Sequence, residues 1–569
     1  MMGARLGSLR AHVPFILLLA ALAPLALHFG WHAGITTVGD DSVSYLTLAH
    51  WFAGDSSDPH LAKWTWWQAH FPPLFPMLLA VTGAWHHLGW AHLLVAGLGI
   101  AAMALFYAYA NVRLQSRLGA FAVAGLFALA PVEWVHTLGI LSEPLFLVLS
   151  LAALLWHQTR LAGRKATDPE WLLFGVLVAL TCLTRLVGVA LIAALVAQAL
   201  CGRLARRKGP GLRELALAVA PTILLLGAWV WLRPMEGGDK YQGIVASSLS
   251  NWIDHPGTML GIAVRSVDDA WISAFTVDPE VPLGMRIVFI GTGLAAVCGA
   301  VLAALANRLD GWYALAFAAI LLGWVFGEEV TRRLFYPLVP LALLHAALAL
   351  RTVLSRSTLR ARGQAFALAT AAALQALLCL PAMVQVQEKS FDRAPVLAGF
   401  PYSYADITDY YTSHGGEARK HAAGELATLA GLTALASATP PDARVMWMRP
   451  EYVALLGHRE GVPWYFRWDA KELARQVRAT GTTHLVLSRY VKTDLTPTPG
   501  DPTPLLGSIL EYSRFAMKLP DATDGSDAFL LLEVEPRRLD EYLRVSPAEH
   551  QHTPREVVPE EHATRRGDL

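Results

Sequence analysis

The chain has 569 residues, which is too long for one ordinary soluble domain. Hydrophobic residues make up 54% of it and charged residues only 16%, with a mean hydropathy of +0.40, whereas a soluble domain carries about 25% charged residues. The formal net charge of +1 and the absence of a basic patch give no indication of nucleic acid binding. None of the four cysteines has metal-ligand spacing to another, and all lie in or beside apolar stretches, so neither a zinc site nor a disulfide framework is predicted.

The apolar residues are unevenly distributed along the chain. Between Ala11 and Val386 they form repeated stretches of about 17–22 residues, long enough to cross a hydrocarbon core of about 30 Å. After Gln387 such stretches stop and charged residues become frequent. We therefore predict a mostly helical membrane domain over residues 1–385, a soluble α/β domain over 386–535, and a charged, partly disordered tail over 536–569.

About eleven membrane spans are predicted in chain order. The first apolar run is long enough for an uncleaved helix and is followed by many others, so we do not interpret it as a secretory signal. Two runs in the middle are short enough to form one broken helix pair, residues 171–184 and 186–201. The remaining predicted spans are 13–31, 91–110, 119–137, 143–159, 214–232, 286–306, 312–327, 334–350 and 364–384.

Arginine and lysine collect in alternate connections between these spans, which predicts the orientation. The basic connections face the cytoplasm when the N-terminus does, as expected for a multi-pass protein of the cell (inner) membrane. Residues 32–90, 233–285 and the soluble domain then lie outside, in the periplasm or its equivalent. The stretch from Phe71 to Ala80 contains three prolines, so we predict a helix at the membrane interface or a re-entrant one within the first outer loop, rather than another crossing.

Acidic residues stand at the outer ends of two predicted spans, where a charge near lipid is costly and therefore a functional candidate. Asp40 and Asp41 follow the first span; they either cap the next helix or supply a general base that takes a proton from an acceptor hydroxyl. Glu143 follows Ser142, a candidate helix N-cap, and either complements the helix dipole or has a second acidic role such as orienting the acceptor or holding a cation. Glu133 is a weaker candidate nearby.

Arginines occur at two further places near the outer membrane surface. Arg185 interrupts an apolar stretch and needs an anionic partner, either one of the acids or a lipid phosphate. Arg332 and Arg333 stand at the entry of a later span, either as a headgroup anchor or as ligands of a diphosphate or phosphodiester, since guanidinium binds phosphate oxygens through paired hydrogen bonds. Lys63 and His70 in the first outer loop are further candidates for phosphate or acceptor contacts, although a histidine among tryptophans is more often an interfacial bystander.

Four short motifs appear in a fixed order along the membrane domain. They are Asp-x-x-x-Tyr (Asp41 to Tyr45), Pro-Pro-Leu-Phe-Pro (Pro72 to Pro76), Ser-Glu-Pro-Leu-Phe (Ser142 to Phe146) and Arg-x-x-x-Pro-x-x-Pro (Arg333 to Pro340). In this order and spacing, residues 1–385 resemble the C-type superfamily of membrane glycosyltransferases, whose members include protein O-mannosyltransferases and the aminoarabinose transferase of lipid A.

The resemblance implies an enzyme that transfers a sugar from a polyprenyl-phosphate donor to an acceptor hydroxyl on a lipid, glycan or protein. It implies that Asp41 is the catalytic base, with Asp40 as an alternative, that Glu143 is the second acidic residue, and that Arg333 meets the carrier phosphate. Arg332 and Arg185 are additional candidates for that phosphate, and Tyr45 and Tyr336 are candidate substrate-binding residues. Metal dependence varies among such enzymes, so no metal ligands are assigned and a divalent cation stays open.

Three other functions are compatible with a chain of this kind. A lipid-linked sugar transporter or flippase would share the arginines without needing Asp41, although no clear inverted repeat of spans is seen. A polysaccharide polymerase or ligase would differ in its donor, and an assembly protein would leave the acids and arginines without a common purpose. For the soluble domain we predict helices over 418–435 and 471–479 and strands over 443–448, 484–488 and 528–534, which act as a stabilising cap or in acceptor recognition.

Overall fold

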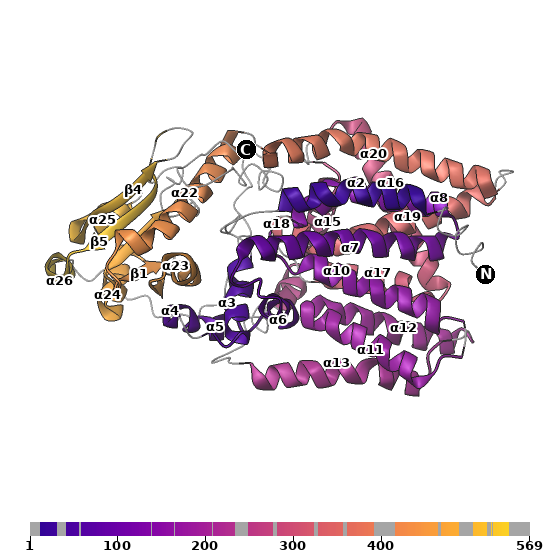
Figure 1. Cartoon of the computed structure of the whole chain (residues 1–569), viewed down its shortest axis with the longest axis horizontal. Helices are drawn as coiled ribbons and strands as arrows, with labels where there is room; N and C mark the ends of the chain where they lie inside the picture. Colours follow the sequence, from indigo (N-terminus) through magenta and orange to yellow (C-terminus); the bar gives the residue numbers. More distant parts are fainter. Residues whose placement is uncertain are drawn as a thin grey trace.

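The computed structural model shows a long helical bundle with a smaller sheet-containing domain at one end (Figure 1). The structure describes residues 12–30, 41–55, 58–137, 139–163, 165–206, 209–233, 248–276, 281–323, 328–356, 361–391, 416–464, 468–488, 504–520, 525 and 527–545. Asp40 lies outside the described residues, so its predicted role as the alternative base has no structural counterpart here.

The bundle helices run alongside one another, with most of their ends gathered at two opposite faces (Figure 1). Its long helices are α2 (Val13–Gly30), α7 (Leu88–Leu114), α8 (Arg117–Leu129), α10 (Glu143–Trp156), α11 (Asp168–Thr184), α12 (Val189–Leu204), α13 (Leu212–Leu232), α16 (Leu283–Leu305), α17 (Leu309–Gly323), α19 (Val339–Leu354) and α20 (Ala361–Phe391).

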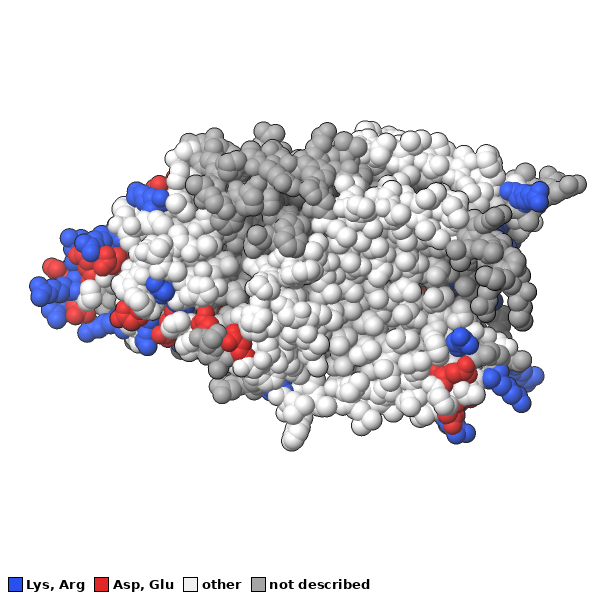
Figure 2. Space-filling view, viewed as in Figure 1, with Lys and Arg blue, Asp and Glu red and all other residues white. Residues whose placement is uncertain are grey.

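On the face shown in Figure 2, the bundle has a broad apolar belt without charged side chains, and Lys, Arg, Asp and Glu gather at the end of the bundle remote from the sheet-containing domain and on that domain itself. Within the described residues, seven helices are long and apolar enough to cross a membrane. Shorter apolar helices occupy Val13–Leu27, Arg117–Leu129 and Leu309–Gly323. The chain is thus built as a multi-pass membrane protein, although the predicted number of about eleven spans is not confirmed.

Two predicted spans are divided in ways that matter for the site. The predicted span 119–137 ends early, because α8 stops at Leu129 and a separate helix, α9 (Pro131–His136), begins at a proline. The predicted broken pair is two distinct helices: α11 ends at Thr184, and a 3₁₀ turn over Leu186–Gly188 leads into α12. Arg185 has an extended backbone between them, with φ −151° and ψ 135°.

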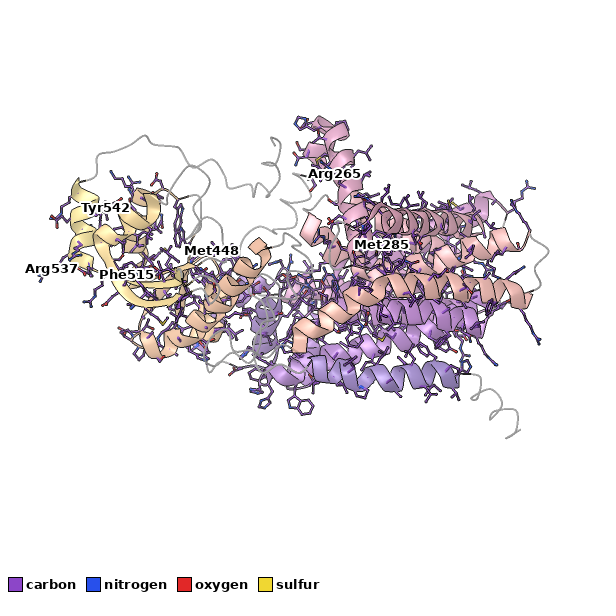
Figure 3. The ribbon with its side chains drawn as sticks, turned by 90° about the horizontal axis from the view of Figure 1, so that it is seen from above. Arg265, Met285, Met448, Phe515, Arg537 and Tyr542 are labelled. Carbon is purple, nitrogen blue, oxygen red and sulfur yellow. The ribbon has the colours of Figure 1, made fainter. Side chains whose placement is uncertain are left out.

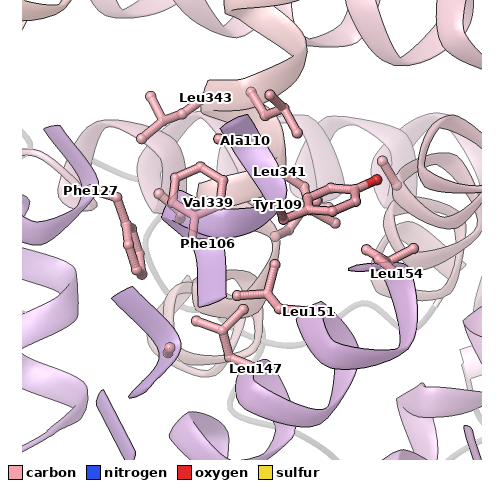
Figure 4. Packing of buried hydrophobic residues seen from close by; sticks show 14 of the residues in the cluster. Phe106, Tyr109, Ala110, Phe127, Leu147, Leu151, Leu154, Val339, Leu341 and Leu343 are labelled. Atoms are coloured by element: carbon pink, nitrogen blue, oxygen red, sulfur yellow. The ribbon is translucent and has the colours of Figure 1, made fainter. Parts of the chain in front are cut away.

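Aliphatic and aromatic side chains from several helices fill the centre of the bundle. Phe106 on α7, Leu147 and Leu151 on α10, and Leu341 and Leu343 on α19 are all at most 3% exposed and pack together (Figure 4). Leu147 and Leu151 lie four residues apart, which places both side chains on the same face of α10. The buried faces of these helices fix their mutual positions and leave polar chemistry to the helix ends.

Helices α16 and α19 pack closely because α16 carries a glycine at the contact. A Cβ at Gly299 would overlap the backbone carbonyl of His345 on α19, so the substitution Gly299→Ala forces two helix backbones apart. We expect it to destabilise the protein by about 1–3 kcal/mol, a typical cost of overpacking. The measurement is the midpoint of thermal unfolding in one detergent.

Gly291 on the same helix provides the matched control, because a Cβ there would meet no atom within 4 Å. Gly291→Ala is expected to leave the midpoint unchanged or to raise it slightly, since alanine favours helix more than glycine does. Equal decreases for the two variants would contradict the packing explanation.

The first outer loop folds into short helices beside the outer end of the bundle. These are α3 (Ser42–Phe52), α4 (Pro59–Ala62), α5 (Thr65–Gln68) and α6 (Leu74–Val81). Helix α6 has eight residues, which is too short to cross a hydrocarbon core of about 30 Å. The length of α6 agrees with a non-crossing helix after Phe71, and its place at the membrane stays a prediction.

The C-terminal domain is a five-stranded sheet between two layers of helices, as expected for an α/β domain. The strand order is β2-β1-β3-β5-β4; β1 pairs in parallel with β2 and β3, and β5 pairs antiparallel with β3 and β4. The elements are α22 (Gly416–Ala438), β1 (Arg444–Trp447), α23 (Pro450–Gly457), β2 (Glu460–Pro463), α24 (Ala470–Thr480), β3 (His484–Ser488), α25 (Pro504–Tyr512), β4 (Ser513–Pro520), β5 (Asp527–Val534) and α26 (Pro536–Val545).

The two faces of the sheet alternate residue by residue along the strands, as strand geometry requires. Val445 and Leu531 belong to a core shared with α22 and α23, while Met446 and Leu530 belong to a core shared with α24, α25 and α26. Each predicted helix and strand of this domain has a counterpart. Elements α23, β2, α25, β4 and α26 are additional, and α26 covers the start of the segment predicted as a tail.

The first of these cores continues into the membrane domain. It joins Tyr45 and Phe75 of the first outer loop to Leu432 of α22 and Phe529 of β5. Met448, just after β1, packs against it and lies where the domain faces the bundle (Figure 3). The outer loop and the C-terminal domain therefore form one continuous apolar unit.

Ion pairs at the edge of this contact connect the same two parts. Lys63 Nζ lies 2.7 Å from Glu460 Oε1, and Arg444 Nε lies 2.9 Å from Glu460 Oε2. Asp58 of the outer loop lies 3.2 Å from His458 Nδ1. Glu460 thus bridges one cation of the loop and one of the C-terminal domain.

This bridge makes the contact sensitive to pH. Burial alone would raise the pKa of Glu460, but the hydrogen bond and charge of Lys63 and the charge of Arg444 outweigh it, and the pKa lies below its ordinary value. Because the folded pKa is the lower one, the stabilisation is fully present above the ordinary value and disappears as the pH falls through the lowered pKa. We expect Glu460→Gln to lower the unfolding midpoint at neutral pH. A difference from the parent protein that persists unchanged at strongly acidic pH would contradict this.

Candidate active site

Four ionisable side chains from distant parts of the chain meet at the end of the bundle beside the C-terminal domain. Asp41 precedes α3, Glu143 begins α10, Arg185 lies between α11 and α12, and Arg333 lies on α18 (Glu328–Phe335). We call these four residues the charged cluster. Each stands at a helix end or break.

Glu143 forms the centre of the charged cluster. Its Oε1 accepts a hydrogen bond from Arg333 Nε and lies 2.6 Å from Arg185 Nη1, and its side chain is fully buried. Its Oε2 is also buried and has no hydrogen-bond partner. A buried carboxylate is tolerated when it is paired in this way, and losing one partner of such a pair typically costs 3–5 kcal/mol. Glu143 thus holds two guanidinium groups in fixed positions.

Asp41 approaches the same arginine from the other side. Its Oδ2 lies 2.8 Å from Arg333 Nη2, but the Nη2 group forms no hydrogen bond, so this contact is an ion pair without hydrogen-bond alignment. Asp41 occupies the N-cap position of α3, yet its side chain forms no capping hydrogen bond. The alternative in which it merely caps the helix is therefore not supported.

Exposure separates the charged cluster into two parts. The Asp41 and Arg333 side chains are 27% and 22% exposed, whereas those of Arg185 and Glu143 are 14% and 0% exposed. A ligand arriving from outside therefore meets Asp41 and Arg333 first. Glu143 can act on that ligand only through the arginines that it holds.

Two hydroxyl groups complete the surroundings of the charged cluster. The Tyr45 hydroxyl lies 2.8 Å from Ser142 Oγ, and Arg185 Nη1 donates a hydrogen bond of 3.1 Å to that same oxygen. Ser142 was predicted as the N-cap of α10; it occupies that position, but its side chain makes no capping hydrogen bond. Its hydroxyl instead connects α3 to the break after α11. Tyr45, a predicted substrate-binding residue, is 2% exposed and contacts the cluster through Ser142.

Two other predicted residues lie beside the cluster without joining it. Arg332, next to Arg333 on α18, is 5% exposed and pairs with Asp269 of α15 (Pro256–Ser273) at 2.5 Å. Tyr336 is fully buried; its hydroxyl donates a 2.8 Å hydrogen bond to Glu133 Oε2, and its ring stacks on His136. The contacts of Arg332 and Tyr336 thus connect neighbouring helices of the bundle.

The remaining predicted contacts are farther along the outer loop. Lys63 pairs with Glu460 of the C-terminal domain rather than with the cluster. The ring of His70 packs on Phe71, which in turn contacts the ring of Tyr45, and His70 Nδ1 lies 2.8 Å from the Trp67 carbonyl oxygen. Sequence reasoning did not identify Asp269, whose role depends on a partner on another helix and leaves no local signal.

The donor set does not resemble a cation site. Among the residues that the structure describes, no group of three or more His, Cys, Asp or Glu side chains could hold a metal ion. Both carboxylates of the cluster face guanidinium groups, and one of them is fully buried. These side chains therefore fit an anion better than a metal ion, because the arginines supply the positive charge that a cation would otherwise bring.

No model of a protein family matches the sequence, and a comparison with curated proteins gives no match. Among solved structures, the chain is similar to ArnT from Cupriavidus metallidurans bound to undecaprenyl phosphate, with 16% identity, a TM-score of 0.48, and coverage of 91% of this chain and 98% of that one. A second similar structure is the oligosaccharyltransferase of Archaeoglobus fulgidus tethered to an acceptor peptide, with 12% identity, a TM-score of 0.47, and coverage of 90% and 74%. Another structure of that oligosaccharyltransferase contains Zn and sulfate.

A third similar structure is the arabinofuranosyltransferase AftD from Mycobacteria, with 16% identity, a TM-score of 0.41, and coverage of 91% of this chain and 40% of that one. Identities and TM-scores of this size describe a distant likeness, which by itself assigns no activity.

Proposed function

We propose that this protein is a glycosyltransferase that moves a sugar from a polyprenyl-phosphate donor to an acceptor hydroxyl at the outer face of the membrane. The observation that carries the proposal is the convergence of Asp41 and Arg333, with Glu143 and Arg185 behind them, at the outer end of an apolar bundle. A partly exposed carboxylate can accept a proton from an acceptor hydroxyl, and a partly exposed guanidinium beside it can bind a phosphate.

The position of the charged cluster suits a donor that is itself a lipid. A polyprenyl chain can stay in the hydrocarbon layer beside the apolar belt, while its phosphate reaches the ends of α10, α11 and α18. Arg333 and Arg185 supply the positive charge, and Glu143 is a positioning residue that fixes both guanidinium groups. Such a donor arrives already activated, so no nucleotide-binding loop is needed.

The reaction is an inverting displacement at the anomeric carbon. Asp41 takes the proton of the acceptor hydroxyl, and the hydroxyl oxygen forms a bond to the anomeric carbon from the side opposite the phosphate. The bond between that carbon and the phosphate oxygen breaks, and its electron pair leaves with the polyprenyl phosphate. Arg333 and Arg185 stabilise the negative charge that grows on this phosphate, which is where preorganised donors have their largest effect.

The distribution of basic residues supports an outward-facing site. Arg113, Arg203 and Arg351 lie near the bundle ends remote from the C-terminal domain, as expected for the cytoplasmic side. In this orientation the charged cluster and the C-terminal domain face the periplasm or its equivalent. The acceptor hydroxyl, whether on a lipid, glycan or protein, then approaches between the first outer loop and the membrane.

The test uses the purified full chain in nanodiscs with a panel of short-chain polyprenyl-phosphate hexoses and pentoses. Lipid, glycan and peptide acceptors are supplied separately, and mass spectrometry follows the release of free polyprenyl phosphate, which is common to every sugar. We expect release that depends on an acceptor for at least one donor. Parallel reactions with and without EDTA report any need for a divalent cation. The absence of release from every donor, together with transport of intact donors across the bilayer of sealed proteoliposomes, would contradict the proposal.

A further inference from the structure

The ion pair between Asp41 and Arg333 has a second consequence for the order of events at the site. Before any ligand arrives, the outer nitrogen of Arg333 faces Asp41 at 2.8 Å, and the other side of the guanidinium faces Glu143. The group proposed to bind the carrier phosphate is therefore already occupied by the group proposed to act as base. Both cannot perform their roles while they remain in contact.

The charges of the cluster make this competition unavoidable. Two guanidinium groups and two carboxylates cancel, so a bound phosphodiester would add a third anion to two cations. Anions that lie close together in a partly buried site repel one another, and this repulsion decreases when one of them moves away.

Asp41 is the carboxylate that can withdraw. Glu143 is fully buried and contacts both arginines through one oxygen, whereas Asp41 is 27% exposed and touches Arg333 without hydrogen-bond alignment. Asp41 also makes no capping hydrogen bond that would hold its side chain in place. Moving it toward solvent breaks fewer contacts than moving any other member of the charged cluster.

We infer that the carrier phosphate displaces Asp41 from Arg333, so that the base becomes free to accept a proton only once the donor is bound. The inference rests on the proposed function and adds an order of steps to it. The donor binds first, and only then can Asp41 remove the proton of the acceptor hydroxyl. In the empty site, the Asp41 carboxylate faces Arg333 and is not available to an acceptor. When the polyprenyl phosphate product leaves, Asp41 returns to Arg333.

The inference predicts that removing the charge of Asp41 improves phosphate binding. Asp41→Asn and Asp41→Ser are expected to bind farnesyl phosphate about fivefold more tightly than the parent protein, the effect of losing one partly exposed competing charge. Asp41→Glu keeps the charge and is expected to show no such gain. Binding is measured by calorimetry on the full chain in nanodiscs, after thermal unfolding shows that each variant is folded.

Two controls make the result specific to charge at this place. Farnesol, which has the same chain without phosphate, should bind equally to the parent protein and to Asp41→Asn. Asp268→Asn removes an exposed carboxylate that pairs with Arg286 on the same side of the molecule and should leave farnesyl phosphate binding unchanged. Unchanged or weaker binding of farnesyl phosphate by both neutral Asp41 variants overturns the inference.

Failure of the inference can be told apart from failure of the proposed function. If Asp41→Asn loses polyprenyl phosphate release without binding farnesyl phosphate more tightly, Asp41 is the base but does not compete with the carrier phosphate. If Asp41→Asn binds farnesyl phosphate more tightly and still releases polyprenyl phosphate at the parent rate, the displacement stands and the assignment of Asp41 as base fails.

Discussion

Replacing Asp41 with asparagine is expected to lower the rate of polyprenyl phosphate release by about a thousandfold, within the range that general bases contribute. Asparagine keeps the size of the side chain but cannot accept the acceptor proton. Because donor binding does not depend on that proton, the loss should appear in kcat, whereas KM for the donor should fall, since the carboxylate that competes with the carrier phosphate has been removed. The measurement is the initial rate of release at saturating donor and acceptor in nanodiscs.

Asp268→Asn is the matched control for this experiment. It removes another carboxylate that is paired with an arginine, but its partner is Arg286 at the end of α16 rather than a member of the charged cluster. If Asp268→Asn releases polyprenyl phosphate at the parent rate and Asp41→Asn does not, the loss is specific to the position of Asp41. Retention of the parent rate by Asp41→Asn would remove Asp41 from the proposed chemistry.

Replacing Arg333 with glutamine is expected to produce a comparable loss for a different reason. The leaving phosphate loses its most exposed positive neighbour, which typically costs a factor of about 10²–10³ in kcat. Farnesyl phosphate should also bind more weakly, since the same group contacts the phosphate of the donor. Arg333→Lys should recover part of the rate and part of the affinity for farnesyl phosphate, because lysine keeps the positive charge but lacks the paired hydrogen-bond donors of a guanidinium group.

The same substitution also affects stability, and this separates it from Asp41→Asn. Without Arg333, the fully buried Glu143 keeps only Arg185 as a cationic neighbour. Losing a partner of a buried ion pair is costly, so the unfolding midpoint should fall along with activity. Arg286→Gln, which breaks a partly exposed pair on the outer side, should change neither the rate nor the midpoint appreciably. A full parent rate in a folded Arg333→Gln protein would exclude Arg333 from phosphate binding.

Hydropathy predicted much of the fold because a helix in lipid must satisfy its own backbone hydrogen bonds. The bundle helices follow the apolar stretches, and the change of composition near Gln387 separates the bundle from the sheet-containing domain. Hydropathy is less informative about helix ends. It did not reveal that Pro131 starts a new helix, because an apolar stretch continues across that break.

Strands were harder to predict than helices in the C-terminal domain. Strands β3 and β5 are dense runs of apolar residues buried on both faces, and both were predicted. Strand β2 has only four residues and includes a glycine and a proline, and β4 is largely exposed at the sheet edge. Neither strand carries the apolar pattern by which strands are recognised, because their place depends on pairing with distant partners.

The members of the charged cluster could be predicted individually, but their pairing could not. A charge at membrane depth is conspicuous in any sequence, so Asp41, Glu143, Arg185 and Arg333 all emerged as candidates. Nothing local indicates that Glu143 holds two arginines or that Arg332 faces away toward Asp269. Adjacent residues on a helix point in different directions, and which of them meets a partner depends on how α18 packs.

The apolar unit that joins the first outer loop to the C-terminal domain bears on how the protein is made. The loop with Tyr45 and Phe75 is translated before most of the bundle helices, whereas its packing partners Leu432 and Phe529 are translated after all of them. The segment that begins with Asp41 therefore lacks its final support until the C-terminal domain has been synthesised. A chain truncated before the sheet would expose apolar side chains outside the membrane, where proteases and chaperones can recognise an incomplete product.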